Sequence, residues 1–208
     1  MAARGRPREF VLDEALDKAI EVFWRHGYEG TTLDDLTGAM DISRPSLYSA
    51  FGNKEATFKR AVERYAEVDM AYVMDALDEP TAYAVAAHYL RANVEAITAP
   101  GKPTGCLSIQ GGLSGSREDQ RIVHFLNDSR ADGEARFADR FRAAILAGDL
   151  PDTEDPAELA KYLSVVTAGL SVQAAAGASR DALSRAAERA LQSFPREIRS
   201  RRNDTGLP

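Results

Sequence analysis

Cysteine is nearly absent from this 208-residue chain, in which Cys106 is the one thiol. A single cysteine can form no internal disulfide and cannot build a cysteine-based zinc cluster. Histidine is also scarce, and His26, His88 and His124 do not stand at a metal-ligand spacing such as H-E-x-x-H. We therefore expect no metal site and no other cofactor. For Cys106 the composition favours a small buried hydrophobic side chain over a nucleophile or a redox sensor.

Long apolar runs and an excess of basic residues are missing as well. No run approaches the roughly 18 residues that a membrane-spanning helix needs, and no basic-then-apolar N-terminal segment signals export. The formal net charge of −6 argues against indiscriminate binding to nucleic acid, because such binding draws its affinity from many neutralised phosphates. We therefore expect a cytoplasmic protein that has no membrane partner.

Catalytic and nucleotide-binding motifs are equally scarce. The glycine-rich stretch A-P-G-K-P-T-G-C-L-S-I-Q-G-G-L-S-G contains neither a G-x-x-x-x-G-K-[ST] nor a G-x-G-x-x-G pattern. Its G-G-L-S-G segment also lacks the G-x-S-x-G order of a nucleophile elbow. The sequence therefore predicts no enzyme active site, and this stretch is interpreted as a loop followed by a short helix near Cys106 to Leu113.

Helical periodicity, by contrast, runs through the whole chain. Apolar residues recur every three or four positions, and no alternation typical of a strand interrupts them. The sequence therefore predicts an all-α fold, with its main helices at about Leu12 to His26, Lys54 to Leu77, Pro80 to Thr98, Asp119 to Ala147, Ala157 to Ala176 and Arg180 to Phe194.

The residues from Thr31 to Lys54 form the most informative stretch. Thr32 with Asp35 is typical of a capping box for one short helix, and Ser43 with Pro45 is typical of the start of a second. Two short helices joined by a tight turn fit a helix-turn-helix, and they also fit an ordinary helical hairpin in a bundle. The outward residues of the second helix suit a DNA groove, because arginine can donate twice to guanine and a helix N-terminus attracts phosphate. These outward residues are Arg44, Pro45, Ser46, Tyr48 and Ser49.

The run D-I-S-R-P-S-L-Y-S-A-F-G-N-K-E-A, with G-Y-E-G-T-T-L-D-D-L ahead of it, closely resembles the DNA-binding domain of the TetR (tetracycline-repressor-like) family of transcriptional regulators. The match spans about Phe10 to Tyr65 without a gap. Pro45-Ser46 stands where the family often has Gly-Thr or Ala-Ser, which leaves the operator sequence open. The resemblance implies that the helix opened by Ser43 is the recognition helix, and that the DNA contacts are Thr31, Thr32, Ser43, Arg44, Pro45, Ser46, Tyr48, Ser49 and, on a phosphate, Lys54.

The two ends of the chain differ in charge from the rest. Residues 1 to 9 form a flexible basic arm in which Arg4 and Arg6 are placed to reach a minor groove, although such an arm also fits a solubilising tail. Residues 200 to 208 are polar and are expected to be disordered. Between these ends we expect a helix-turn-helix DNA-binding domain at residues 10 to 54 and a larger helical effector-binding and dimerisation domain at residues 55 to 199.

The second domain carries two further expectations. The resemblance implies a dimer interface on the two C-terminal helices, which hold more apolar and small residues than one core face needs; packing inside one subunit is the alternative. It also implies an effector pocket beside the Cys106 helix, although aromatic residues at helical spacing equally fit a filled core. Because the candidate residues carry no concentrated charge, we expect an apolar or weakly polar, aromatic effector. The candidates for this pocket are Tyr89, Asn93, Gln110, His124, Phe125 and Tyr162.

These features together predict a ligand-responsive transcriptional regulator. It would act as a repressor, bind a near-palindromic operator as a homodimer and be released by a small-molecule effector. The alternative from another class is a helical small-molecule-binding protein without DNA-binding activity. Sequence-selective retention of genomic fragments in an electrophoretic shift would favour the regulator.

Overall fold

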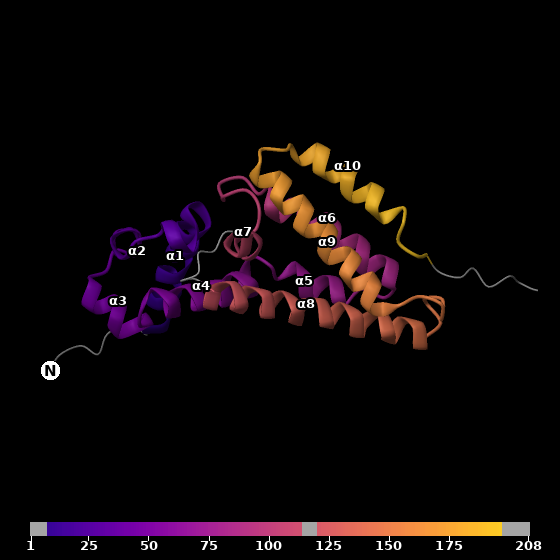
Figure 1. Ribbon diagram of the computed structural model, residues 1–208, viewed down its shortest axis with the longest axis horizontal. Coiled ribbons are helices and arrows are strands. Elements are labelled where there is room, and N and C mark those ends of the chain that lie inside the picture. The colour runs from indigo at the N-terminus through magenta and orange to yellow at the C-terminus, as the bar shows by residue number, and fades with distance from the viewer. Residues whose placement is uncertain (1–7, 114–119, 197–208) are drawn as a thin grey trace, which may run out of the picture.

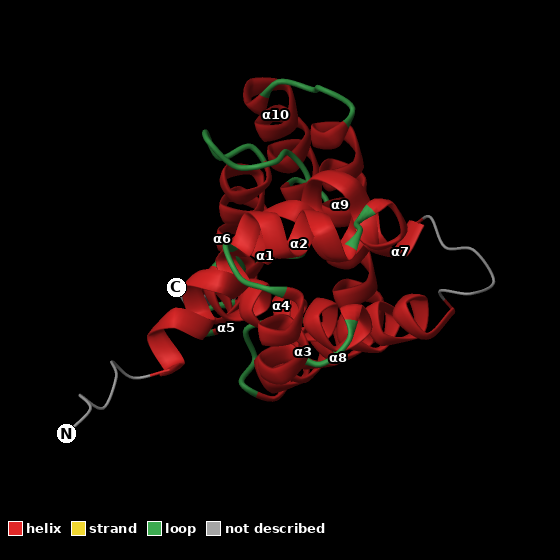
Figure 2. Cartoon of the chain, turned by 90° about the vertical axis from the view of Figure 1, so that its left-hand side faces the viewer, coloured by secondary structure: helices red, strands yellow, loops and turns green. Residues whose placement is uncertain are grey.

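A computed structural model of the chain describes residues 8–113 and 120–196. Within these residues every regular element is an α-helix and no strand occurs, which confirms the all-α prediction (Figure 2). The predicted arm with Arg4 and Arg6 and the polar tail at 200 to 208 lie outside the described residues. The helices are α1 Arg8–Gly30, α2 Leu33–Met40, α3 Arg44–Phe51, α4 Lys54–Val68, α5 Tyr72–Leu77, α6 Ala82–Ile97, α7 Leu107–Leu113, α8 Gln120–Leu146, α9 Pro156–Ala175 and α10 Arg180–Leu191.

Helices α1 to α3 gather at one end of an elongated molecule, and α4 leads from them towards the remaining helices (Figure 1). An aromatic cluster holds this end together, with the ring of Phe58 on α4 edge-on to Phe23 of α1 at a centroid distance of 4.9 Å. Tyr28 meets the same ring at 5.2 Å. Because α4 supplies a central ring of this cluster, α4 and the short helices form one packed unit.

The rest of the chain packs around α6, α8 and α9, with α10 covering the outer side (Figure 1). Their buried side chains include Leu90, Phe141 and Leu163, each at most 1% exposed. Two contacts tie α10 to α6: the ion pair of Arg91 with Glu188 at 2.6 Å, and a 2.9 Å bond from the Arg180 guanidinium to the Thr98 carbonyl. No helix in the described part of the chain is both long and apolar enough to cross a bilayer.

Several helix boundaries differ from the sequence prediction, and α1 extends beyond the predicted range of Leu12 to His26 at both ends. The predicted helix from Lys54 to Leu77 is wrong, because α4 ends at Val68, where the N–H groups of Asp69 and Met70 both bond to the Tyr65 carbonyl. Pro80 lies before α6 and not in its first turn, since the hydroxyl of Thr81 provides the N-cap by accepting from the N–H of Ala84.

The last helix is also shorter than predicted. Helix α10 ends at Leu191 and not at Phe194. Phe194 precedes Pro195, whose ring disfavours a helical backbone at the residue before it. The N–H groups of Gln192, Ser193 and Phe194 accordingly bond to carbonyls three residues earlier, in the tighter pattern of a fraying terminus.

Gly105 fixes the loop between α6 and α7 against α9. Its φ is +90°, and a Cβ added there would lie 2.7 Å from Gln110 Nε2 and 3.0 Å from the Ser171 carbonyl oxygen. We predict that Gly105→Ala lowers the free energy of unfolding by about 1–3 kcal/mol, measured by denaturant titration. Gly101 is the matched control, because its φ is +80° but no atom lies within 4 Å of an added Cβ. If Gly105→Ala and Gly101→Ala lower the free energy of unfolding equally, the contact with α9 has no role in the effect.

Candidate nucleic-acid interface and internal cavity

A closed turn sets α3 against α2. Asp41 adopts the left-handed conformation at φ 56°, and its N–H and that of Ile42 both bond to the Thr37 carbonyl. Leu36 of α2 and Leu47 of α3 are fully buried below this turn. The two short helices therefore form the helix-turn-helix that the sequence predicts.

The N-caps of α2 and α3 are those that the sequence predicts. The Thr32 hydroxyl accepts from the N–H of Asp35, whose carboxylate accepts from the N–H of Thr32 at 2.8 Å. The Thr32 hydroxyl also donates to this carboxylate at 2.7 Å, and this bond, followed by the one from the Thr32 N–H, holds the pKa of Asp35 below its usual range. Ser43 caps α3 by accepting from the N–H of Ser46 at 3.2 Å, and the Asn53 amide caps α4.

The N-cap and the outward face of α3 contain six of the residues that were predicted to meet DNA. Each of these side chains is exposed, and Tyr48 is 52% exposed although it is a large aromatic residue. Exposed tyrosine and arginine beside a helix N-terminus supply both base-edge donors and a positive helix end. The exposed set is Ser43, Arg44, Pro45, Ser46, Tyr48 and Ser49.

Thr31 is the exception among the predicted DNA contacts. It is 1% exposed, and its hydroxyl donates to the Gly27 carbonyl at 2.6 Å. Gly27 has a φ of 70° and breaks the helical path of α1, so its carbonyl is available for this bond. Thr32, in contrast, is exposed, and Lys54 at the start of α4 lies half-buried with its Nζ 4.4 Å from the centre of the Tyr28 ring.

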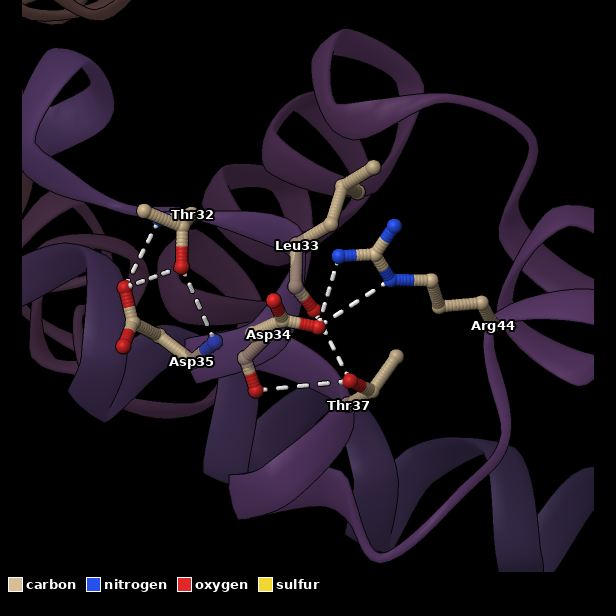
Figure 3. A network of polar contacts seen from close by, with 6 residues as sticks. All are labelled: Thr32, Leu33, Asp34, Asp35, Thr37 and Arg44. Atoms are coloured by element: carbon tan, nitrogen blue, oxygen red, sulfur yellow. Dashed lines mark hydrogen bonds and ion pairs between the residues drawn. The ribbon is translucent and has the colours of Figure 1, made fainter.

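Arg44 is held on the surface by an acid from the neighbouring helix (Figure 3). Its Nε and Nη2 both donate to Asp34 Oδ1, at 3.0 and 2.7 Å. This hydrogen bond raises the pKa of Arg44. Sequence reasoning missed Asp34, because nothing in the spacing shows that a residue ten positions away faces Arg44.

Helix α4 is bonded to both α3 and α1. Arg60 donates to the Ala50 carbonyl near the end of α3 at 2.7 Å, and its guanidinium lies 4.9 Å from the centre of the Phe51 ring. Arg64 pairs with Asp17 and Asp13 of α1, at 2.5 and 3.0 Å. Any tilt of α4 must therefore move the helix-turn-helix with it or break these contacts.

A cavity of about 310 Å³ lies behind α4, between α5, α6, α7, α8 and α9. Its size falls within the range of small-molecule sites. The exposed area of the lining is largely apolar, and its polar groups come from α6, α7, α8 and α9. It comprises Val62, Ala66, Met70, Val73, Met74, Tyr89, Asn93, Cys106, Ser108, Ile109, Ser129, Arg130, Asp132, Gly133, Glu134, Arg136, Phe137, Ala160, Ser164, Thr167 and Ser171.

Two of the six predicted pocket residues, Tyr89 and Asn93, line this cavity. The other four lie elsewhere. The Gln110 amide donates to the Thr104 carbonyl at 3.3 Å, and the Tyr162 hydroxyl donates to the Ala190 carbonyl at 2.9 Å.

His124 and Phe125 lie nearer the α4 end of α8. His124 is exposed, with its Nδ1 2.6 Å from the Gln120 carbonyl oxygen one turn earlier in α8. Phe125 packs near Lys59 of α4, whose Nζ is 5.6 Å from the ring centre. Sequence periodicity identified the right helices but not the turn of α8 that faces the cavity, which begins at Ser129.

Asn93 is the most distinctive polar group of the cavity. It is 4% exposed, and its Nδ2 donates to the Tyr72 hydroxyl at 3.0 Å. Its Oδ1 is buried and accepts no hydrogen bond from the described residues. A buried acceptor without a donor is costly, so a bound molecule with a donor group would stabilise this site.

The aromatic wall beside Asn93 is uncharged. The rings of Tyr72 and Tyr89 stack at 6.1 Å, and Phe137 lies 4.5 Å from Tyr89. Burial raises the pKa of both Tyr72 and Tyr89, so their hydroxyls stay protonated at neutral pH. The four charged residues of the lining, on α8, comprise two acids and two bases and therefore add no net charge: Arg130, Asp132, Glu134 and Arg136.

Cys106 is buried, as predicted, and lies on the cavity wall. Its Sγ is 3.5 Å from both the Tyr65 hydroxyl and the Ser108 hydroxyl. Among the described residues, no group of three or more histidines, cysteines and acids is placed to hold a metal ion.

Comparisons with known proteins agree with this arrangement. The family model described as bacterial regulatory proteins, tetR family, matches residues 15–61. The chain is 32% identical over 199 residues to the HTH-type transcriptional repressor ComR of Escherichia coli K12, a match that covers 95% of each chain. Its structure is similar to a cysteine mutant of the TetR family transcriptional regulator CifR complexed with a 26-bp double-strand operator DNA. That similarity has a TM-score of 0.85 and 39% identity, and covers 93% of this chain and 100% of the CifR chain.

The exposed helix-turn-helix, the helical body and these full-length similarities lead to one conclusion: the chain belongs to the TetR family of transcriptional regulators.

Proposed function

We propose that the protein represses transcription by binding a near-palindromic operator as a homodimer, and that a small uncharged effector releases it. The observation that carries this proposal is the placement of α4. Its first residues follow the recognition helix α3, and its later residues Val62 and Ala66 form one wall of the cavity. Helix α4 therefore links the DNA-binding helix α3 to the cavity. We further propose that the protein acts on DNA in the cytoplasm.

The DNA contacts assigned to the chain are the exposed face of α3, the N-terminus of α4 with Lys54, and Thr32. Thr31 contributes through the fold of the loop, because its side chain is buried. With a net charge of −6, affinity cannot come from a general positive surface and must come from a few well-placed groups. The arm with Arg4 and Arg6 would add contacts in the minor groove. CifR in complex with operator DNA supports this assignment by similarity.

The exposed apolar stripe of α9 supports dimerisation through this helix. Val165 is 63% exposed and Val172 is 40% exposed, and the surface around Gly169 between them is open. Leu191 of α10, in contrast, is 1% exposed and packs inside the subunit. The apolar centre of a two-fold interface would therefore come from α9, with α10 supplying polar residues at its edge.

The effector is assigned to the cavity of about 310 Å³. Neutral tyrosines, an aromatic wall and a balanced set of charged residues fit an uncharged aromatic molecule. The unpartnered Asn93 Oδ1 fits one hydroxyl or N–H donor on that molecule. The role is one of binding and not of catalysis, in line with the repressor and regulator relatives.

Selection from a pool of random duplexes tests DNA recognition and yields the operator. On that operator we predict that Arg44→Ala weakens binding by about 1–3 kcal/mol and relaxes the preferred sequence at one position of each half-site. Lys54→Ala should weaken all sequences to a similar degree and reduce the slope of log affinity against log salt by about one. Fluorescence anisotropy at several salt concentrations measures both effects. Failure of the wild-type chain to enrich any sequence would favour a helical small-molecule-binding protein without DNA-binding activity.

A further inference from the structure

Asp34 of α2 lies beside the recognition helix and is bonded to its arginine (Figure 3). We infer that Asp34 is a positioning residue, which fixes the Arg44 guanidinium for one base and so sets sequence preference without touching that base. This inference rests on the proposed function, since it assumes that α3 enters a DNA groove.

In this pair, Asp34 leaves one edge of the Arg44 guanidinium available to donate to a guanine base. A guanidinium has a side edge, formed by Nε and one terminal nitrogen, and an end edge, formed by the two terminal nitrogens. Asp34 Oδ1 accepts from Nε and Nη2, which is the side edge. The end edge, Nη1 with the second hydrogen of Nη2, is the fork that donates to O6 and N7 of guanine.

Both partners stand on the surface where DNA would lie. The Arg44 side chain is 56% exposed and that of Asp34 is 75% exposed. An arginine with such freedom samples many rotamers and can reach a phosphate as readily as a base. The bond to Asp34 selects one orientation, and the carboxylate also disfavours a nearby phosphate.

Asp34 is itself well placed for this task. It is the second residue of α2, where the positive end of the helix dipole favours an acid. The capping box of Thr32 and Asp35 fixes the backbone on either side of it (Figure 3). The Asp34 carboxylate is therefore attached to a fixed segment of backbone, and the position of Arg44 is set by the packing of α2 against α3.

A positioning role and a plain repulsive charge predict different effects on base preference. If Asp34 only repels phosphate, Asp34→Ala should strengthen binding to every duplex and leave base preference unchanged. If Asp34 positions Arg44, the same substitution should strengthen binding to random-sequence DNA and remove the preference for guanine at the position that Arg44→Ala also relaxes. Loss of one bidentate contact corresponds to a roughly 5- to 150-fold loss of discrimination.

The experiment compares five full-length chains: wild type, Asp34→Ala, Asp34→Asn, Arg44→Ala and the control Asp41→Asn. Each is subjected to selection from the same random duplex pool, and its affinities for the selected operator and for a random-sequence duplex are measured by anisotropy. Asp34→Asn keeps an acceptor oxygen and should recover part of the discrimination. Thermal unfolding of each variant, expected to stay within a few degrees of wild type, shows that the helix-turn-helix remains folded.

Asp41→Asn is the matched control for charge. Asp41 is exposed in the turn between α2 and α3, and asparagine tolerates its left-handed conformation. This variant removes one negative charge near the same surface and should keep the wild-type base preference. If Asp34→Ala keeps the guanine preference as Asp41→Asn does, the inference is wrong while the proposed function stands. If wild-type protein selects no sequence, the proposed function itself fails.

Discussion

Replacing both Gly169 and Val172 with arginine should leave a monomer whose affinity for the operator is lower by at least about 100-fold. The two side chains lie on the exposed stripe of α9, where an added charge in a two-fold interface would meet its own copy. Operator binding should fall with dimerisation, because two linked recognition helices exceed the affinity of one by factors of about 10²–10⁴. Light scattering after size exclusion measures the assembly, and anisotropy measures the affinity.

Leu146→Arg is the control for this experiment. Leu146 is 85% exposed at the end of α8, so the substitution adds an arginine to an apolar surface residue outside the exposed stripe of α9. It should remain a dimer with wild-type affinity. A dimer that persists in the Gly169→Arg, Val172→Arg chain would remove α9 from the interface.

Local chemistry explains why the helix-turn-helix could be predicted in detail. The capping box of Thr32 and Asp35 and the cap at Ser43 depend on residues three positions apart, so the sequence itself contains both partners of each bond. The break in α1 at Gly27 is equally local. These features fix the helix boundaries and with them the outward face of α3.

The cavity could be predicted only as a region, because its lining depends on packing between distant helices. Periodicity shows that Phe125 and Phe137 both belong to the inner face of α8, yet of the two only Phe137 lines the cavity. Thr167 lines the cavity beside Tyr89, 78 positions away in the sequence, with hydroxyl oxygens 3.4 Å apart. No spacing rule connects such a pair.

The break between α4 and α5 was missed for a related reason. Apolar residues continue from Tyr65 to Leu77 at helical spacing, so the pattern predicts one long helix. In the structure Met70 lies in the break, contributes to the cavity wall and has its Sδ 3.9 Å from the Ser108 hydroxyl oxygen. Because of this break, the helix that links the cavity to the DNA-binding surface is α4 alone, which has 15 residues.

In the proposed coupling, effector binding in the cavity changes the position of the recognition helix through this short helix, and so the affinity for the operator. Val62 and Ala66 line the cavity, and Arg60, less than one turn before Val62, bonds to the end of α3. An effector that prefers a tilted α4 would shift the two recognition helices of a dimer relative to each other. Its effect on operator affinity cannot exceed its own preference between the two states.

Asn93→Leu should lower the protein's affinity for its effector while operator affinity without effector stays at the wild-type value. The ligands for this test are uncharged aromatic compounds found by thermal-shift screening, each compared with a partner in which a methyl ether replaces the hydroxyl. If Asn93 Oδ1 accepts from the ligand, the substitution leaves the ligand's donor buried and unpaired, which costs about 1–3 kcal/mol, or roughly 5- to 150-fold in affinity. The methyl ether should lose a similar amount on wild-type protein and little on Asn93→Leu.

Tyr162→Phe serves as the control for this last prediction. It also removes a polar group from the helical body, but the Tyr162 hydroxyl bonds to the Ala190 carbonyl and the residue does not line the cavity. Effector affinity by calorimetry and effector-induced release by anisotropy should both match wild type in this variant. Equal binding by wild type and Asn93→Leu would show that the ligand does not use the unpartnered acceptor. A ligand that binds wild type tightly and leaves operator affinity unchanged would instead contradict coupling through α4, because binding would then occur without any preference between its two positions.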